Sequence, residues 1–233
     1  MSNNEAEEEN FDPVADLHQR QQRVRQDMGG AAKVAKMQAD GVPTIRDHID
    51  GVLDEGSFRE IGTFSRSMRL EDRSNTPGDG KVGGEGMING KPVAIAGDDI
   101  TVKKGSSAIV GSRRIGRLYD RALERGMPYV YIGETGGGRI PDLIGAEGIA
   151  DVAPALSVSR RRRQIPMATA IVGQSFGGSS FQSAFSDFVV QVRGSVLAVT
   201  SPRVFEIATG EVIGFEELGG VDVHSRITGQ IAL

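Results

Sequence analysis

The second half of the chain alternates short apolar runs with glycine-rich turns and helical stretches. The runs at residues 129–132, 167–172 and 196–200 each have the length of a buried strand. The first two lead into glycine-rich turns, and the third leads into Ser201-Pro202, a pair that commonly starts a helix. Strands that alternate with helices indicate an α/β domain whose strands are buried and largely parallel.

Helix signals dominate the N-terminal region. Residues 12–40 are polar and rich in Arg, Gln, Lys and Ala, which predicts a surface helix interrupted at Gly29-Gly30. Thr44 and Asp47 have the spacing of a capping box, so we expect a short helix to begin there.

Turn signals organise the middle of the chain. The pair Asn89-Gly90 lies between two apolar segments and is typical of a hairpin with a type I′ turn. Residues 58–64 are expected to form a strand and residues 65–80 a loop. Further helices are expected at residues 112–125 and 140–163.

Composition limits the functional classes. Four glutamates lie within the first ten residues, and the rest of the chain carries 27 acidic and 27 basic side chains. A neutral body gives no general attraction to nucleic acid, and the acidic end is most simply a solubilising tail. The chain lacks cysteine, which fits a reducing cytoplasm. No apolar run reaches the roughly 18 residues of a membrane span, and the acidic start predicts no signal peptide.

The first glycine-rich turn offers bare backbone at a strand end. Gly136, Gly137 and Gly138 follow the strand at 129–132 directly, so their N–H groups can converge on one point. Such a point suits a phosphate or a thioester oxygen that becomes an enolate. The phosphate-loop and dinucleotide patterns are not matched, and a tight turn without a ligand is the alternative.

The second glycine-rich turn, residues 173–178, contains the pattern G-x-S-x-G of a nucleophile elbow. In a serine hydrolase Ser175 would be the nucleophile, with His224 as the base and Asp187 or Asp222 as the acid. Only 58 residues follow Ser175, which is short for the remainder of such a fold. The alternative is a turn whose glycines let a helix pack closely on a strand.

Other polar clusters favour surface roles. His48 with Asp47 and Asp50 is expected on a solvated helix face, so no metal site is predicted. The arginines at 160–163 would stabilise a helix C-terminus or attract the phosphates of coenzyme A.

Five segments together resemble the carboxyltransferase β subunits of the propionyl-CoA, acetyl-CoA and methylcrotonyl-CoA carboxylases. They run in family order and are residues 44–60, 78–96, 133–140, 173–188 and 209–229. The resemblance implies a crotonase-like fold of the ClpP/crotonase type, in which β-β-α turns stack into a superhelix. It divides the chain into an acidic tail with a helical arm, residues 1–40, and an acyl-CoA carboxyltransferase domain of N-terminal type, residues 41–233.

The resemblance also implies a site. The N–H groups of Gly137 and Gly138 would stabilise the thioester enolate during carboxyl transfer. The first motif here ends in Gly138-Arg139 where the family usually has Ala-Arg, and Phe176 stands where small residues are usual. The substrate-binding residues that the resemblance implies are Gly136, Arg139, Phe176, Gly177 and Gly178.

The implied reaction needs more than this chain. Carboxybiotin on a partner carrier protein would donate the carboxyl group to an acyl-CoA, and a biotin carboxylase would charge the carrier. The resemblance covers about residues 40–233, the first of two homologous halves. The second half is therefore expected either on a separate C-terminal-half subunit or in a longer chain of which this is a truncated part, and an oligomer is expected. An acyl-CoA decarboxylase of the same fold, the serine hydrolase and a non-catalytic assembly subunit remain alternatives.

Overall fold

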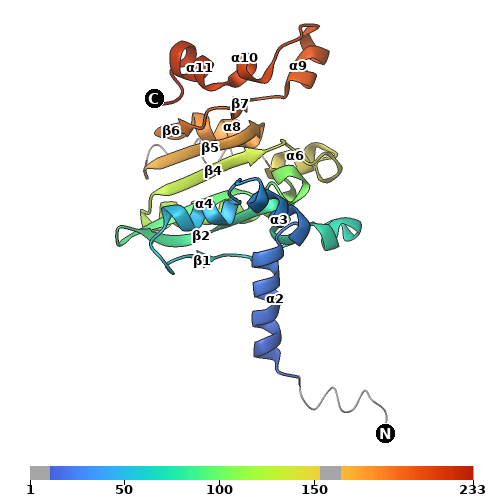
Figure 1. The fold of residues 1–233 in the computed structure, drawn as a ribbon, viewed down its shortest axis with the longest axis vertical. Helices are drawn as coiled ribbons and strands as arrows, with labels where there is room; N and C mark the ends of the chain where they lie inside the picture. The colour runs from blue at the N-terminus through green and yellow to red at the C-terminus, as the bar shows by residue number, and fades with distance from the viewer. Residues whose placement is uncertain (1–10, 153–163, 233) are drawn as a thin grey trace.

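The computed structural model describes residues 11–152 and 164–232, which form a mixed β-sheet covered by helices (Figure 1). Seven strands lie in the order β1-β2-β3-β4-β5-β6, with β7 pairing with β5. Strands β1 to β3 pair antiparallel, and the pairs from β3 onward are parallel. The strands are β1 (Arg59–Glu60), β2 (Lys81–Ile88), β3 (Lys91–Asp98), β4 (Tyr129–Thr135), β5 (Met167–Phe176), β6 (Phe188–Gln191) and β7 (Val196–Ala198).

The helices differ greatly in length. The α-helices are α2 (Pro13–Asp27), α3 (Ala31–Ala39), α4 (Ile45–Val52), α5 (Ile109–Arg125), α6 (Ala146–Val152), α8 (Gly178–Ala184), α9 (Pro202–Thr209), α10 (Phe215–Gly219) and α11 (Val221–Val223). The tighter or wider turns are η1 (Leu70–Asn75), η2 (Pro77–Gly80), η3 (Lys103–Gly105), η4 (Ile140–Asp142) and η5 (His224–Thr228).

Local sequence signals account for several boundaries. The capping box at α4 is present in both directions between Thr44 and Asp47. Asn89 and Gly90 both have positive φ, 50° and 74°, as the type I′ hairpin between β2 and β3 requires. Gly126 ends α5 in the left-handed conformation with φ 66°.

Two hydrophobic cores lie on opposite faces of the sheet, because alternate residues of β3 belong to different cores. Ala94 and Ala96 pack with Leu118 and Tyr119 of α5, where the Tyr119 ring meets Tyr129 edge-on. On the other face, the alternate β3 residues Val93 and Ile95 pack with α4 and with Met28 and Val34 of the N-terminal arm. The arm therefore contributes to the core of the domain that follows it.

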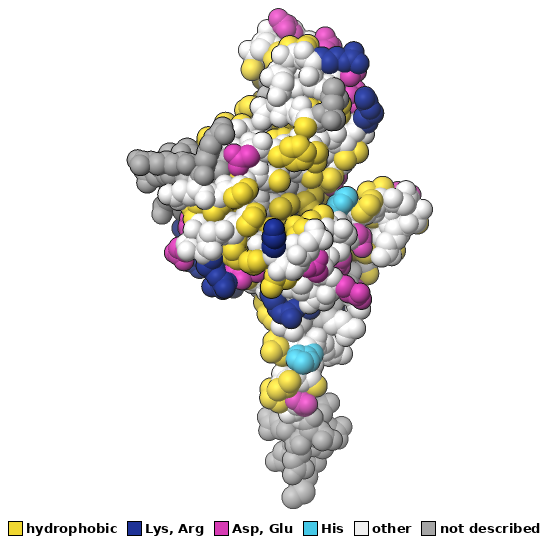
Figure 2. All heavy atoms as spheres, turned by 90° about the vertical axis from the view of Figure 1, so that its left-hand side faces the viewer, with side chains coloured by type: hydrophobic (Ala, Val, Ile, Leu, Met, Phe, Trp, Pro, Cys, Tyr) yellow, Lys and Arg dark blue, Asp and Glu magenta, His cyan; other side chains and the backbone are white. Residues whose placement is uncertain are grey.

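The two ends of the chain lie at opposite ends of the sheet (Figure 1). Helix α2 projects away from the body and buries none of its residues. The C-terminal helices α9, α10 and α11 lie beyond β7 and leave large apolar side chains exposed, as does the neighbouring α8. These include Phe181, Val204 and Ile207, and Val199 between β7 and α9 is also exposed; the four are 45 to 76% exposed. The space-filling view likewise shows hydrophobic side chains gathered across the middle of one face (Figure 2).

Several expectations need correction. The strand expected at 58–64 shortens to β1, and the loop expected at 65–80 contains η1 and η2. Strand β5 continues to Phe176, so most of the expected second turn is strand, held there because Gln174–Phe176 pair with β7. Strand β6 was not expected. The arginines at 160–163 lie outside the described residues. No helix in the described ranges is both long and apolar enough to cross a bilayer.

Candidate functional site

The two glycine-rich segments contact each other at the carboxyl ends of β4 and β5. A β-carbon added to Gly177 would lie 3.8 Å from the Cα atom of Gly137, and one added to Gly137 would lie 3.9 Å from the Cβ atom of Phe176. A β-carbon on Gly178 would find nothing nearer than the Ser107 Oγ atom, 3.9 Å away. We call Ser107, Gly136–Gly138 and Gly177–Gly178 the glycine cluster. Ligands of parallel sheets commonly bind at this edge.

The backbone N–H groups of the first glycine segment have different partners. Gly136 N–H donates to the Lys104 carbonyl at 2.9 Å, and Gly137 N–H donates to the Thr135 hydroxyl at 3.1 Å. Gly138 N–H has no hydrogen-bond acceptor among the described residues. Of the three donors, the one on Gly138 is therefore available to a ligand.

Ser107 fixes the direction of the Gly138 N–H group. Ser107 N–H donates to the Gly137 carbonyl at 2.8 Å, and Arg139 N–H donates to the Ser107 carbonyl at 2.8 Å. This is a parallel bridge between Ser107 and Gly138. In such a bridge the N–H and C=O groups of the central residue point to the opposite side, so Gly138 presents its donor away from Ser107.

The Thr135 side chain stabilises the first glycine segment through two hydrogen bonds. Its buried hydroxyl donates to the Gly105 carbonyl at 2.8 Å and accepts the Gly137 N–H. The side chain thereby satisfies a backbone donor and a backbone acceptor at once. The resemblance pointed to the glycines, and it gave Thr135 no role.

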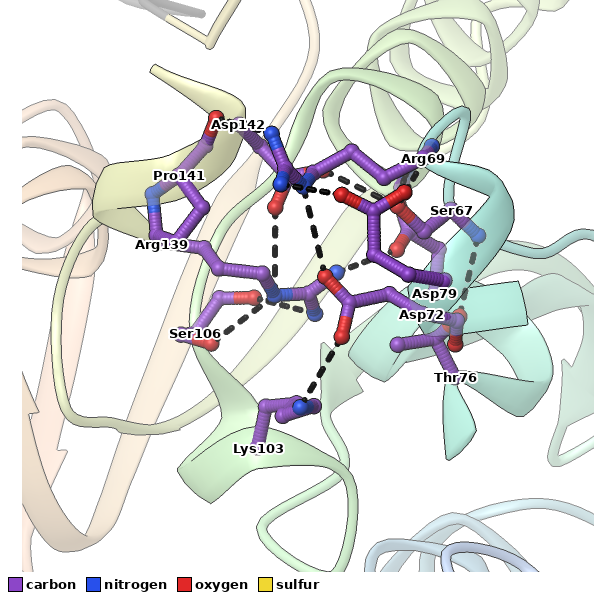
Figure 3. Close-up of polar contacts among 12 residues, drawn as sticks. Ser67, Arg69, Asp72, Thr76, Asp79, Lys103, Ser106, Arg139, Pro141 and Asp142 are labelled. Carbon is purple, nitrogen blue, oxygen red and sulfur yellow. Dashed lines mark hydrogen bonds and ion pairs between the residues drawn. The ribbon is translucent and has the colours of Figure 1, made fainter. Parts of the chain in front are cut away.

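The Arg139 side chain is buried in a polar network behind the loop (Figure 3). Its guanidinium donates to Asp79 Oδ1 at 2.6 Å and to Ser106 Oγ and O, each at 3.2 Å. The second Asp79 oxygen accepts the Gly111 N–H at 2.8 Å, in the first turn of α5. The guanidinium was expected to contact substrate, but it is 5% exposed and contacts protein groups instead. Arg139 therefore acts on the loop's position.

A second ion pair borders this network. Lys103 Nζ lies 3.0 Å from Asp72 Oδ1, and Figure 3 shows the two side chains meeting below Arg139. The hydrogen bond from Lys103 lowers the pKa of the Asp72 carboxyl. Ser67, which precedes η1, donates a hydrogen bond from its hydroxyl to Asp142 Oδ1 in η4 at 3.0 Å. The turns before β2 are thus tied to the segment that follows the glycines.

Phe176 is buried and packs on the C-terminal segment. Its ring centroid lies 6.4 Å from that of Phe215 in α10, with the planes tilted by 31°. Only 5% of Phe176 is exposed, and its Cβ atom borders Gly137. The aromatic ring therefore connects the glycine cluster to the last helices of the chain.

The serine hydrolase alternative is not supported by the geometry around Ser175. Ser175 is fully buried within β5, and its hydroxyl is hydrogen-bonded to Ser179. His224 uses its two ring nitrogens on Leu197 O at 2.7 Å and Thr228 Oγ1 at 3.0 Å. A nucleophile elbow needs its serine exposed on a strained turn, and Ser175 has neither property.

A buried polar group next to β4 was also not foreseen. Asp98 forms an ion pair with Lys81 and accepts hydrogen bonds from the Tyr131 hydroxyl at 2.8 Å and the Glu134 N–H at 3.0 Å. Burial and the nearby Asp98 charge raise the pKa of the Glu134 carboxyl. A β-carbon on Gly173 would collide with that carboxyl in its present position, so a larger residue there would require the Glu134 side chain to move. Within the described ranges no cluster of three or more metal-binding side chains is present.

The chain belongs to the carboxyl transferase domain family, whose pattern matches residues 36–233. It is 31% identical to the methylmalonyl-CoA carboxyltransferase 12S subunit of Propionibacterium freudenreichii subsp. shermanii over 215 residues. That alignment covers 91% of this chain and 41% of the relative, so the chain spans about two fifths of the relative's length.

Solved structures agree with this assignment. Transcarboxylase 12S, described as a hexamer assembly with methylmalonyl-coenzyme A and methylmalonic acid bound, superposes with a TM-score of 0.82 at 30% identity. The superposition covers 94% of this chain and 43% of that chain. A Pseudomonas malonate decarboxylase hetero-tetramer in complex with malonate gives a TM-score of 0.69 at 25% identity. That superposition covers 78% of this chain and 73% of the decarboxylase chain. The predicted α/β fold of crotonase-like class is confirmed.

Proposed function

We propose that this chain binds an acyl-CoA thioester at the glycine cluster and stabilises its enolate during carboxyl transfer. The observation that carries the proposal is the Gly138 N–H group, which has no acceptor among the described residues and directly follows Gly137, the residue at which the two glycine segments meet. Family membership supplies the reaction class.

The open backbone of the cluster fits a thioester. An added β-carbon would come no closer than 3.5 Å to any other atom at Gly136, Gly137, Gly177 or Gly178. Each of these glycines therefore leaves room for about one methyl group beside its backbone. Side chains there would fill that space. Gly138 differs, because an added β-carbon would lie 2.6 Å from the flexible end of Leu143.

The chemistry requires charge stabilisation at one oxygen. When the α-carbon of the acyl group loses its proton, negative charge moves to the thioester oxygen, and that carbon then forms a bond to the transferred carboxyl carbon. A fixed N–H donor at that oxygen lowers the barrier, typically by a factor of about 10² to 10³ per donor. We assign this donor to Gly138, while Gly137, the other expected donor, is held by Thr135. Carboxybiotin on a carrier protein would supply the carboxyl group as its nitrogen–carboxyl bond breaks, and the biotin nitrogen left behind would accept the proton from the α-carbon.

The remaining expected site residues have supporting positions. Gly177 and Gly178 border the bound thioester, and Gly136 leaves space beside it. Phe176 positions the second glycine segment by packing against Phe215. Arg139 positions the first glycine segment through its ion pair with Asp79.

We further propose that a second carboxyltransferase half completes the site and holds the biotin. The relatives' greater length supports this, as does the exposed apolar surface of the C-terminal helices. A cavity of about 430 Å³ lined by Phe181, Leu197, Val199 and Phe205 lies on that surface. The assembly would be an oligomer containing acyl-CoA, the biotin carrier and its carboxylase. Decarboxylation, the activity named for the malonate decarboxylase relative, would use the same enolate in reverse.

Calorimetry tests the binding step directly. The folded chain is expected to bind acetyl-CoA and propionyl-CoA, and carboxyl transfer is expected only after the second half and a charged carrier are added. A folded sample that binds neither thioester would overturn the proposal. Transfer by the chain alone would overturn the need for a second half.

A further inference from the structure

The backbone beside the glycine cluster is held in an unfavourable conformation at a lysine. Lys104 has φ 57° and ψ 38°, in the left-handed region, and Lys103 before it has φ 48°. Glycine occupies this region without a steric cost, whereas a lysine is disfavoured there. Such backbone strain at a residue with a long charged side chain commonly marks a functional site.

Lys104 adjoins the glycine cluster directly. Its carbonyl accepts the Gly136 N–H at 2.9 Å, and a β-carbon added to Gly136 would lie 3.5 Å from the Cβ atom of Lys104. The lysine side chain therefore begins beside Gly136, two residues from the proposed enolate donor.

The two neighbouring lysines differ in their partners. The Lys103 ammonium forms an ion pair with Asp72 at 3.0 Å. The Lys104 side chain is exposed, and its ammonium has no carboxylate or other acceptor among the described residues. A lysine whose ammonium has no protein partner, next to the glycine cluster, is suited to binding an anionic part of the substrate.

An acyl-CoA offers two kinds of anion, and their positions differ. The phosphates lie beyond the whole pantetheine arm, far from the thioester. The carboxylate of a malonyl-type thioester is bonded to the α-carbon, next to the oxygen that Gly138 would bind. Because the Lys104 side chain begins beside Gly136, its ammonium can reach this carboxylate, which is the nearer of the two anions.

Resting on the function proposed above, we propose that Lys104 is a specificity-determining residue whose ammonium pairs with the carboxylate on the α-carbon. The site then discriminates carboxylated thioesters, such as malonyl-CoA and methylmalonyl-CoA, from their uncarboxylated counterparts. The backbone strain is retained because a glycine at this position would provide no charge.

Calorimetry with malonyl-CoA and acetyl-CoA tests this on the full chain. The wild type is expected to bind malonyl-CoA more tightly than acetyl-CoA. Lys104→Met is expected to weaken malonyl-CoA binding about two- to fivefold, the size of a partly exposed ion pair, and to leave acetyl-CoA binding unchanged. Lys91→Met, in the distant β2–β3 hairpin, removes the same charge and is expected to change neither affinity.

Lys104→Gly separates strain from charge. It is expected to lose the same discrimination while raising the melting temperature by about 2–4 °C, because glycine relieves the left-handed backbone. Equal weakening of both ligands by Lys104→Met would assign the ammonium to the phosphates and overturn the proposal, and so would unchanged discrimination. A wild type that binds neither thioester would instead overturn the underlying function.

Discussion

Arg139 and Asp79 form an ion pair of 2.6 Å between Nη1 and Oδ1, and both side chains are almost completely buried. The pair joins the end of the glycine run to η2, 60 residues earlier. Asp79 also accepts the N–H of Gly111, so the same carboxylate ties the run to the first turn of α5. The position of the Gly138 donor therefore depends on contacts far from it in sequence.

Replacing Arg139 with Met should destabilise the fold, because the Asp79 carboxylate would remain buried without its cation. The expected loss is about 3–5 kcal/mol in the free energy of unfolding, measured by urea denaturation. Arg121→Met is the matched control. It breaks an ion pair to Glu85 in which Arg121 is 51% exposed, so its loss is expected to cost far less stability than the loss of Arg139. Equal costs for the two variants would show that burial does not strengthen the Arg139 pair.

Removing the Thr135 hydroxyl should disturb the glycine cluster itself. In Thr135→Val, the Gly137 N–H loses its acceptor and the Gly105 carbonyl keeps only the Lys81 ammonium as a donor, at a cost of about 1–3 kcal/mol. Acyl-CoA affinity, measured by calorimetry, should fall together with stability. Thr135→Ser keeps the hydroxyl and should stay close to wild type. A serine variant as weak as the valine variant would contradict this role.

Much of the fold was predictable because its signals are local. The Thr44 capping box, the Asn89-Gly90 turn and the Gly126 helix end each depend on residues within a few positions of one another. Strand β5 was predicted too short, because Gly173 and Gly177 suggest a turn, whereas pairing with β7 keeps residues up to Phe176 extended. That pairing is tertiary and leaves no local pattern.

The two glycine segments were recognisable for the same reason, whereas their role in binding stays a prediction. The glycines carry a visible motif, and the structure brings the two glycine segments together. The residues that orient them, Thr135, Ser107 and Asp79, act through a few hydrogen bonds, most of which join segments far apart in the sequence. Lys104 carries no sequence signal, because its left-handed backbone is apparent only from the coordinates.

The raised pKa of Glu134 should make stability depend on pH. The unfolded chain ionises this carboxyl near its ordinary pKa of 4.5, while the folded chain ionises it only at higher pH. The unfolded state is therefore favoured as pH rises from 4.5 to the folded pKa, and the destabilisation is constant above it. In Glu134→Gln this loss should vanish, so the variant should gain stability over wild type across that range, as measured by urea denaturation.

Glu85 provides a control of opposite sign. Its hydrogen bond from Arg121 lowers its pKa, so its contribution is present above pH 4.5 and is lost as pH falls through the folded pKa. Glu85→Gln should therefore lose stability relative to wild type at neutral pH. A Glu134 variant that behaves like the Glu85 variant would contradict the assignment of burial as the cause.

Substituting Ser175 should leave thioester binding intact. Ser175→Ala removes a buried hydroxyl whose partner is Ser179, which should cost about 1 kcal/mol of stability. Acyl-CoA affinity should not change, and any slow thioester hydrolysis should persist in the variant. Loss of a hydrolytic activity in both Ser175→Ala and His224→Ala would restore the nucleophile interpretation that the buried geometry contradicts.

Amide NMR on the ¹⁵N-labelled chain can follow the Gly138 N–H, the group proposed to bind the thioester oxygen. On titration with propionyl-CoA, the Gly138 amide proton should shift downfield with saturation at the calorimetric affinity, and Gly177 and Gly178 should shift with it. The Gly136 amide, which donates to the Lys104 carbonyl, should move less. Saturable binding that leaves the Gly138 and Gly177 resonances in place would contradict the account.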